Sequence, residues 1–189
     1  MIQARLAAPR RAAAVTGLIL GAALLRALLL PLGDVLSTVV FGGCLLAISW
    51  FERPAPMTGA RWGRGWALVA GLMVGAILLA PVVTGPLSAR TLGAFLPWAA
   101  IAAIIATLEE TSIRGILYQR WAGEAGTIAA IVIGAAVFAL IHLPRYGLGA
   151  MPLDAAVGLA LGGLRALTGR VLPCAVAHIV ADWGAWFWA

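Results

Sequence analysis

Apolar runs long enough to cross a lipid bilayer follow one another along almost the whole chain. A helix needs about 20 apolar residues to span the hydrocarbon core of a bilayer. Short polar or proline-containing segments separate the runs, so the sequence predicts about seven spans, within a range of six to eight. The predicted spans cover 12–32, 34–50, 65–84, 91–121, 126–143, 152–167 and 171–188.

The composition excludes a soluble globular domain. Hydrophobic residues make up 63% of the 189 residues and charged residues only 11%, whereas a soluble domain is about half apolar and a quarter charged. A single soluble core of this size could not hide so much apolar surface. We therefore expect an all-α, polytopic transmembrane helix bundle that forms one domain over 1–189.

The basic residues point to a membrane rather than to a nucleic acid. The net charge is +6 and every basic residue is arginine. A basic balance can indicate nucleic-acid binding, but most of these arginines lie between apolar runs, at the cytoplasmic ends that the positive-inside rule predicts. We expect an integral protein of the bacterial inner membrane, with a cytoplasmic N-terminus and no nucleic-acid partner. Arg26 interrupts the first apolar run, which favours a retained span over a cleaved signal peptide.

Small residues recur at spacings that suit close helix packing. Cys44 and Cys174 lie inside apolar segments without metal-binding or disulfide spacing, and we interpret them as packing residues. Glycine pairs four residues apart let helix backbones approach closely, and we expect them to pack within the bundle. These pairs are Gly17 with Gly21, Gly71 with Gly75, and Gly158 with Gly162.

Ionisable residues inside the predicted spans are the candidates for function. Each such group costs about 2.5–3.5 kcal/mol on insertion scales, whereas an interhelical hydrogen bond in a membrane contributes roughly 0.6 kcal/mol. A structural network is therefore a poor reason to keep several of them, although one ion pair could be structural. They are Glu109, Glu110 and Arg114 in the fourth span, His142 in the fifth, and His178 with Asp182 in the seventh.

Helical spacing indicates which of these groups can meet. Glu110 and Arg114 are four residues apart, in the order that favours an ion pair. Glu109 lies about 100° around the helix from Glu110 and can face another neighbour. The fourth and fifth spans are joined by a short loop and should pack antiparallel. Glu109 and His142 then differ in depth by only about 6 Å, so we expect their side chains to meet.

Three short motifs in these spans resemble those of a known family. Residues 109–114 fit E-E-x-x-x-R, residues 138–142 fit F-x-x-x-H, and residues 178–182 fit H-x-x-x-N/D. In this order and on separate spans, they are similar to the motifs of the CPBP intramembrane proteases. That family includes the type II CAAX prenyl endopeptidases and bacteriocin-processing or immunity relatives. The resemblance covers 96–189, the expected catalytic half.

The resemblance implies a role for each matching residue. Glu109 would activate a water molecule as general base, and His142 would help to hold that water. His178 and Asp182 would stabilise the oxyanion. The family often has Asn at the last position, and an aspartic acid donates a hydrogen bond only when protonated, so Asp182 could instead orient His178. The supporting residues would be Glu110, Arg114 and Phe138.

Other chemistries remain open on the sequence. The chain contains neither H-E-x-x-H nor G-x-S-x-G, which excludes the usual zinc-protease helix and the serine elbow. It also contains no lysine that could activate a serine. We expect no cofactor, although Glu109, His142, His178 and Asp182 would supply four ligands acceptable to zinc.

Other functions and the substrate also remain open. A proton- or metal-coupled transporter and a non-catalytic immunity or scaffold relative are the alternative functions. The expected partner is a membrane-anchored protein or peptide substrate, prenylated or not. We expect the site to open toward the outer side, and the sequence leaves the oligomeric state undetermined.

Overall fold

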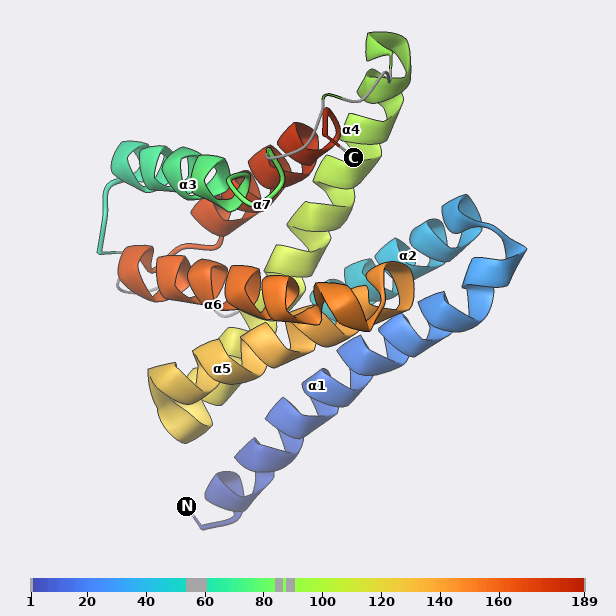
Figure 1. The fold of residues 1–189 in the computed structure, drawn as a ribbon. Coiled ribbons are helices and arrows are strands. Elements are labelled where there is room, and N and C mark those ends of the chain that lie inside the picture. The colour runs from blue at the N-terminus through green and yellow to red at the C-terminus, as the bar shows by residue number, and fades with distance from the viewer. Residues whose placement is uncertain (1, 54–60, 84–86, 88–90, 189) are drawn as a thin grey trace.

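The computed structural model describes the whole chain except residues 1, 54–60, 84–86, 88–90 and 189. The described residues form helices and turns, with no strand among them, as predicted (Figure 1). The predicted loops between the second and third spans and between the third and fourth fall partly on the residues not described. The elements are α1 (Ile2–Leu29), η1 (Leu30–Leu32), α2 (Asp34–Glu52), α3 (Arg64–Leu78), α4 (Leu92–Glu110), η2 (Thr111–Leu117), α5 (Tyr118–Tyr146), η3 (Leu148–Ala150), α6 (Met151–Thr168) and α7 (Leu172–Ala185).

The predicted fourth and fifth spans form one long helical hairpin. The chain runs through α4, η2 and the first turns of α5 without interruption, and it reverses at Gly126, where φ is +87°. Only glycine adopts this conformation without steric cost. The rest of α5 turns back and packs against η2, while α4 diverges from it (Figure 1). The reversal expected from the short connection is present, but the close antiparallel packing is limited to the part of the hairpin near the turn.

Fewer helices are long enough to cross a bilayer than the seven spans that the sequence predicts. Within the described residues, four apolar helical stretches are long enough to cross a bilayer: Arg11–Leu32, Asp34–Glu52, Gly93–Tyr146 and Leu148–Thr168. The third of these contains the reversal at Gly126. The helices α3 and α7 are apolar but have only 15 and 14 residues. At 1.5 Å per residue each is about 22 Å long, so the count of seven is not confirmed.

Glycines bring two pairs of helices into close contact. A Cβ atom added to Gly71 would lie 2.6 Å from the carbonyl oxygen of Pro173 in α7, and one added to Gly158 in α6 would lie 2.7 Å from Ala135 Cα in α5. The predicted packing role is confirmed for these pairs. It is wrong for Gly17 and Gly21, which face outward with no atom within 4 Å of an added Cβ.

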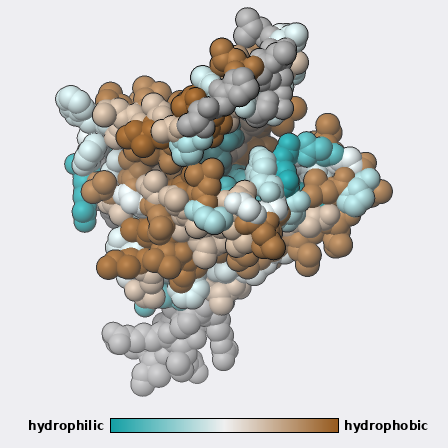
Figure 2. Space-filling view, viewed as in Figure 1, coloured by the Kyte–Doolittle hydropathy of each residue, from teal (hydrophilic) through white to brown (hydrophobic). Residues whose placement is uncertain are grey.

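The outside of the bundle is apolar, as a bilayer requires. Large hydrophobic side chains are exposed on every long helix, for example Phe51, Ile77 and Ile128, and they cover much of the face seen in Figure 2. The main core lies between α1, α2, η2 and α5 and includes Phe41 and Phe138. The chain is therefore an integral membrane protein whose interior and exterior are both largely apolar.

Candidate active site

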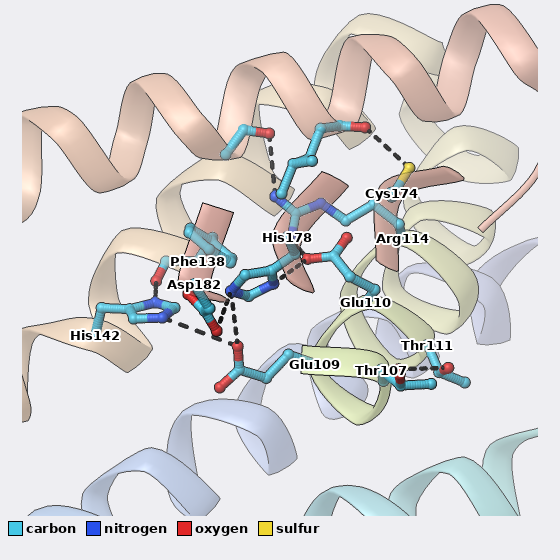
Figure 3. Close-up of polar contacts among 12 residues, drawn as sticks. Thr107, Glu109, Glu110, Thr111, Arg114, Phe138, His142, Cys174, His178 and Asp182 are labelled. Carbon is cyan, nitrogen blue, oxygen red and sulfur yellow. Dashed lines mark hydrogen bonds and ion pairs between the residues drawn. The ribbon is translucent and has the colours of Figure 1, made fainter. Parts of the chain in front are cut away.

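The three motifs converge on one place inside the bundle (Figure 3). Glu109 and Glu110 end α4 and Arg114 follows in η2. Phe138 and His142 come from the returning arm of α5, while His178 and Asp182 come from α7. The structure thus brings together all the residues that the sequence predicted for the site, and these are Glu109, Glu110, Arg114, Phe138, His142, His178 and Asp182.

Glu109 faces both histidines. Its Oε2 atom lies 3.9 Å from His142 Nε2 and 3.8 Å from His178 Nε2, and the residue is buried. The predicted meeting of Glu109 with His142 is confirmed. Both distances exceed the 2.7–3.2 Å of a direct hydrogen bond, and separations of this size suit a polar contact bridged by water.

The ring of His142 is oriented by its own helix. Its Nδ1 atom lies 2.8 Å from the carbonyl oxygen of Phe138, one turn earlier. A carbonyl oxygen only accepts hydrogen bonds, so Nδ1 carries the proton and the lone pair of a neutral ring is on Nε2, the atom that faces Glu109. The ring of Tyr146, one turn later, stacks on the imidazole with a centroid distance of 5.8 Å.

His178 is oriented by the second glutamate. Its Nδ1 atom lies 3.1 Å from Glu110 Oε1, which also accepts a hydrogen bond of 2.9 Å from Arg114 Nη1. Because this carboxylate pairs with the guanidinium, Nδ1 of His178 is the donor. Its Nε2 atom faces the Glu109 carboxylate and lies 3.8 Å from Asp182 Oδ2. The two histidines thus present their Nε2 atoms to the same carboxylate.

The ion pair between Glu110 and Arg114 is confirmed, and it is completely enclosed. Arg114 also donates from Nη2 to the carbonyl oxygen of Gly158 at 3.2 Å, and its guanidinium lies 4.6 Å from the centroid of the Phe138 ring. A buried pair is tolerated only when further hydrogen bonds satisfy it. These contacts tie α4, η2, α5 and α6 together behind His178.

A π-helical segment follows the two glutamates, where the sequence predicts an ordinary helix. It covers Thr111–Leu117, and six of its residues in succession are buried. Arg165 of α6 donates from Nε to the carbonyl oxygen of Arg114 at 2.9 Å and lies over the ring of Tyr118. This hydrogen bond satisfies a carbonyl oxygen inside the π-helical segment from a neighbouring helix, and no signal in the sequence indicates the contact.

A cavity of about 420 Å³ adjoins the site and is lined by Glu109, His142, His178 and Asp182. The sequence analysis missed several of its other polar lining residues. Among them, Arg26 had a sequence feature that could have marked it as a candidate, because it is a charged residue inside an apolar run. Tyr146 carried no such signal. The other polar lining residues are Asp34, Thr38, Trp98, Arg145 and Trp186.

Three of the side chains could hold a metal ion. One ligand atom each of Glu109, His142 and His178 lies within 4.8 Å of the others. Both histidines are anchored through Nδ1, as zinc-binding histidines usually are. Ligand atoms around a tetrahedral zinc are about 3.4 Å apart, so this group is somewhat open. Asp182, the fourth ligand expected in the zinc alternative, does not join it.

Comparison with known proteins identifies a family. A protein-family model described as type II CAAX prenyl endopeptidase Rce1-like matches residues 90–184, which is half of the chain. The matched range contains the two glutamates, both histidines and Asp182. No curated protein and no solved structure matches the chain.

Proposed function

Because this chain belongs to the Rce1-like family of type II CAAX prenyl endopeptidases, we propose that it hydrolyses a peptide bond with a water activated by Glu109 and His142. The family indicates a membrane protease, and this favours proteolysis over the transporter alternative. The observation that supports the mechanism is the position of one carboxylate oxygen between two imidazole Nε2 atoms, at 3.8 and 3.9 Å.

The proposed nucleophile is a water held between Glu109 and His142. The carboxylate of Glu109 and the unprotonated Nε2 atom of His142 are both acceptors, so each takes one hydrogen of the water. The lone pairs of the water oxygen then point away from both groups and toward a bound carbonyl carbon. Glu109 removes the proton during attack and returns it to the leaving nitrogen, as a general base that becomes a general acid.

His178 is the proposed donor to the tetrahedral oxyanion. Its Nδ1–H is occupied by Glu110, so its Nε2 atom donates only when the ring is doubly protonated. Glu109, Glu110 and Asp182 surround the ring with carboxylates, which favours that charged form electrostatically. A well-placed oxyanion donor contributes about 2.7–4 kcal/mol to transition-state stabilisation.

Zinc is the second candidate, because three side chains offer ligand atoms close together. We favour the metal-free mechanism, since the ligand atoms are farther apart than a tetrahedral ion requires. The two are separated by measuring zinc content by mass spectrometry and activity after dialysis against 1,10-phenanthroline. We expect less than one zinc per ten chains and unchanged activity. Stoichiometric zinc whose removal abolishes cleavage would establish the metalloenzyme instead.

The proposed substrate is membrane-anchored. The side of the cavity formed by α2 and α4 includes the apolar residues Val35, Val39, Ile101 and Ile105, and these suit a lipid-like or hydrophobic group attached to the peptide. The family name specifies prenylated CAAX substrates. A membrane peptide without a prenyl group would use the same surface, so both kinds should be assayed.

The test is cleavage of a fluorogenic prenylated CAAX peptide by the purified protein in proteoliposomes. We expect Glu109→Gln to lower kcat by about 10²–10⁴-fold, the usual contribution of a general base, at unchanged protein abundance. Glu52→Gln is the matched control, because Glu52 pairs with Arg120 at a partly exposed site, and it should retain full activity. Unchanged kcat in Glu109→Gln would refute the proposal.

A further inference from the structure

Arg26 is a buried cation in the wall of the cavity. It lies near the C-terminal end of α1, outside the residues that match the family, and only 5% of its surface is exposed. Its guanidinium lies 4.9 Å from the centroid of the Phe41 ring, and its Nε atom is buried without a hydrogen-bond partner. No carboxylate of the described residues forms an ion pair with it.

The other charged groups that line the cavity have partners. Arg145 donates from Nη1 and Nη2 to the two carboxylate oxygens of Asp34, at 2.8 and 3.0 Å. Glu109 and Asp182 both face His178. Arg26 is thus a charged group of the cavity wall that has no ion pair among the described residues and whose Nε atom lacks a hydrogen-bond partner, although its charge acts on Glu109 at longer range. A buried charged group is tolerated best when hydrogen bonds satisfy it, and a bound carboxylate would supply acceptors to the guanidinium of Arg26.

We propose that Arg26 binds a carboxylate of the peptide that occupies the cavity. The inference rests on the proposed function, which places a peptide beside Glu109. A guanidinium presents parallel N–H donors whose geometry matches a carboxylate, and such charge-assisted bonds are among the strongest hydrogen bonds in proteins. The ring of Phe41 lies against the guanidinium, and Arg26 lines the cavity that a ligand would enter.

Two sources could supply the carboxylate, namely the C-terminus of the peptide or an acidic side chain. In either case Arg26 acts as a specificity residue, because replacing the carboxylate by an amide removes the charge but keeps the shape. Glu109 and Asp182, which line the same cavity, would otherwise repel a bound anion. Arg26 therefore makes an anionic peptide acceptable in a cavity that carries two acidic groups.

The experiment measures binding, so that it does not depend on cleavage. Three apolar tripeptides are titrated into the full-length protein in a maltoside detergent, which contains no phosphate, and binding is followed by calorimetry. The first has a free C-terminal carboxylate, the second is its carboxamide, and the third is the carboxamide with Asp at the middle position. We expect the wild type to bind at least one carboxylate-bearing tripeptide roughly 10- to 100-fold more tightly than the plain amide.

Variants of Arg26 test whether this preference comes from that residue. Arg26→Gln should abolish the preference for a carboxylate, while binding of the plain amide stays unchanged. Arg26→Lys should retain part of the preference, because lysine keeps the positive charge but lacks the parallel N–H donors of the guanidinium. Arg120→Gln is the matched control, since Arg120 pairs with Glu52 and does not line the cavity, and it should keep the full preference. The tighter of the two carboxylate-bearing tripeptides identifies the source.

Two results would overturn the inference. The first is equal affinity of the wild type for acid and amide, and the second is an unchanged preference in Arg26→Gln. Cleavage of the prenylated CAAX peptide together with either result would leave the protease function intact and remove only the role of Arg26. Conversely, an Arg26-dependent preference without any cleavage would retain the binding site and refute the protease.

Discussion

Asp182 differs from the other acidic groups of the site in its exposure. Its side chain is 39% exposed, whereas that of Glu110 is fully enclosed and that of Glu109 is 4% exposed. Its Oδ2 atom lies 3.8 Å from His178 Nε2, one helical turn earlier, and it lines the cavity. This position is compatible with both roles considered from the sequence, namely donation to an oxyanion and orientation of His178.

We predict that Asp182→Asn retains activity within about fivefold of the wild type. An amide can donate to an oxyanion through its nitrogen and can accept from His178 through its oxygen, so either role survives. Asp182→Ala removes both functions and should lower kcat by roughly 10²-fold or more, as the loss of one oxyanion donor does. Steady-state kinetics on the fluorogenic peptide distinguishes the two variants. Equal losses in Asn and Ala would show that the negative charge itself is required.

Among the elements, α7 depends on α3 for its position. The two helices lie side by side (Figure 1), and within the described part of the chain α3 packs mainly against this helix, which carries His178, and less against α6. Gly71 faces the backbone of Pro173, and Gly75 faces the carbonyl oxygen of Ala177 at 2.8 Å from an added Cβ. Ala177 directly precedes His178, so a shift of α7 at this contact would move the imidazole.

We predict that Gly71→Ala destabilises the protein by about 1–3 kcal/mol, the usual cost of overpacking, because the added Cβ would lie 2.6 Å from a backbone oxygen that has little freedom to move. Gly21→Ala is the matched control, since nothing lies within 4 Å of its added Cβ. The control should be neutral or slightly stabilising, because alanine is the better helix former. Thermal unfolding in detergent measures both. A lower Tm in Gly21→Ala than in Gly71→Ala would contradict this packing.

For the whole molecule, the residues at one end of the bundle decide where the cavity opens. Asp34 begins α2, Arg145 and Tyr146 end α5, and Trp186 directly follows α7, and all of them line the cavity. With the N-terminus in the cytoplasm, as the arginine distribution predicts, this end lies on the outer side of the membrane. We therefore propose that a substrate reaches Glu109 from the outer side.

We predict that Thr38→Cys is labelled on intact cells by a membrane-impermeant maleimide, in a background where Cys44 and Cys174 are replaced by alanine. Thr38 lines the cavity and should be reached from outside. Thr127→Cys is the matched control, because Thr127 is exposed beside the reversal at Gly126, at the opposite end of the hairpin. It should be labelled only after permeabilisation. The opposite pattern would place the N-terminus and the cavity mouth on reversed sides.

The sequence by itself determined the features that depend on composition and on local helical spacing. The apolar runs require a membrane bundle, and a spacing of four residues places Glu110 beside Arg114 and Phe138 beside His142 whatever the rest of the chain does. The antiparallel hairpin followed from a short connection, which is why the meeting of Glu109 with His142 could be predicted.

Only the tertiary structure decided which way each helix faces. Lipid tails are as apolar as leucine. Helix faces that contact lipid and faces that contact other helices therefore carry similar apolar residues, and the sequence pattern does not distinguish them. For that reason Gly17 and Gly21 could not be distinguished from Gly71 and Gly75, and Arg26 could not be assigned to the cavity. The Nδ1 partner of His178 depends on contacts between helices that are distant in the sequence, and these contacts exist only after the bundle has packed.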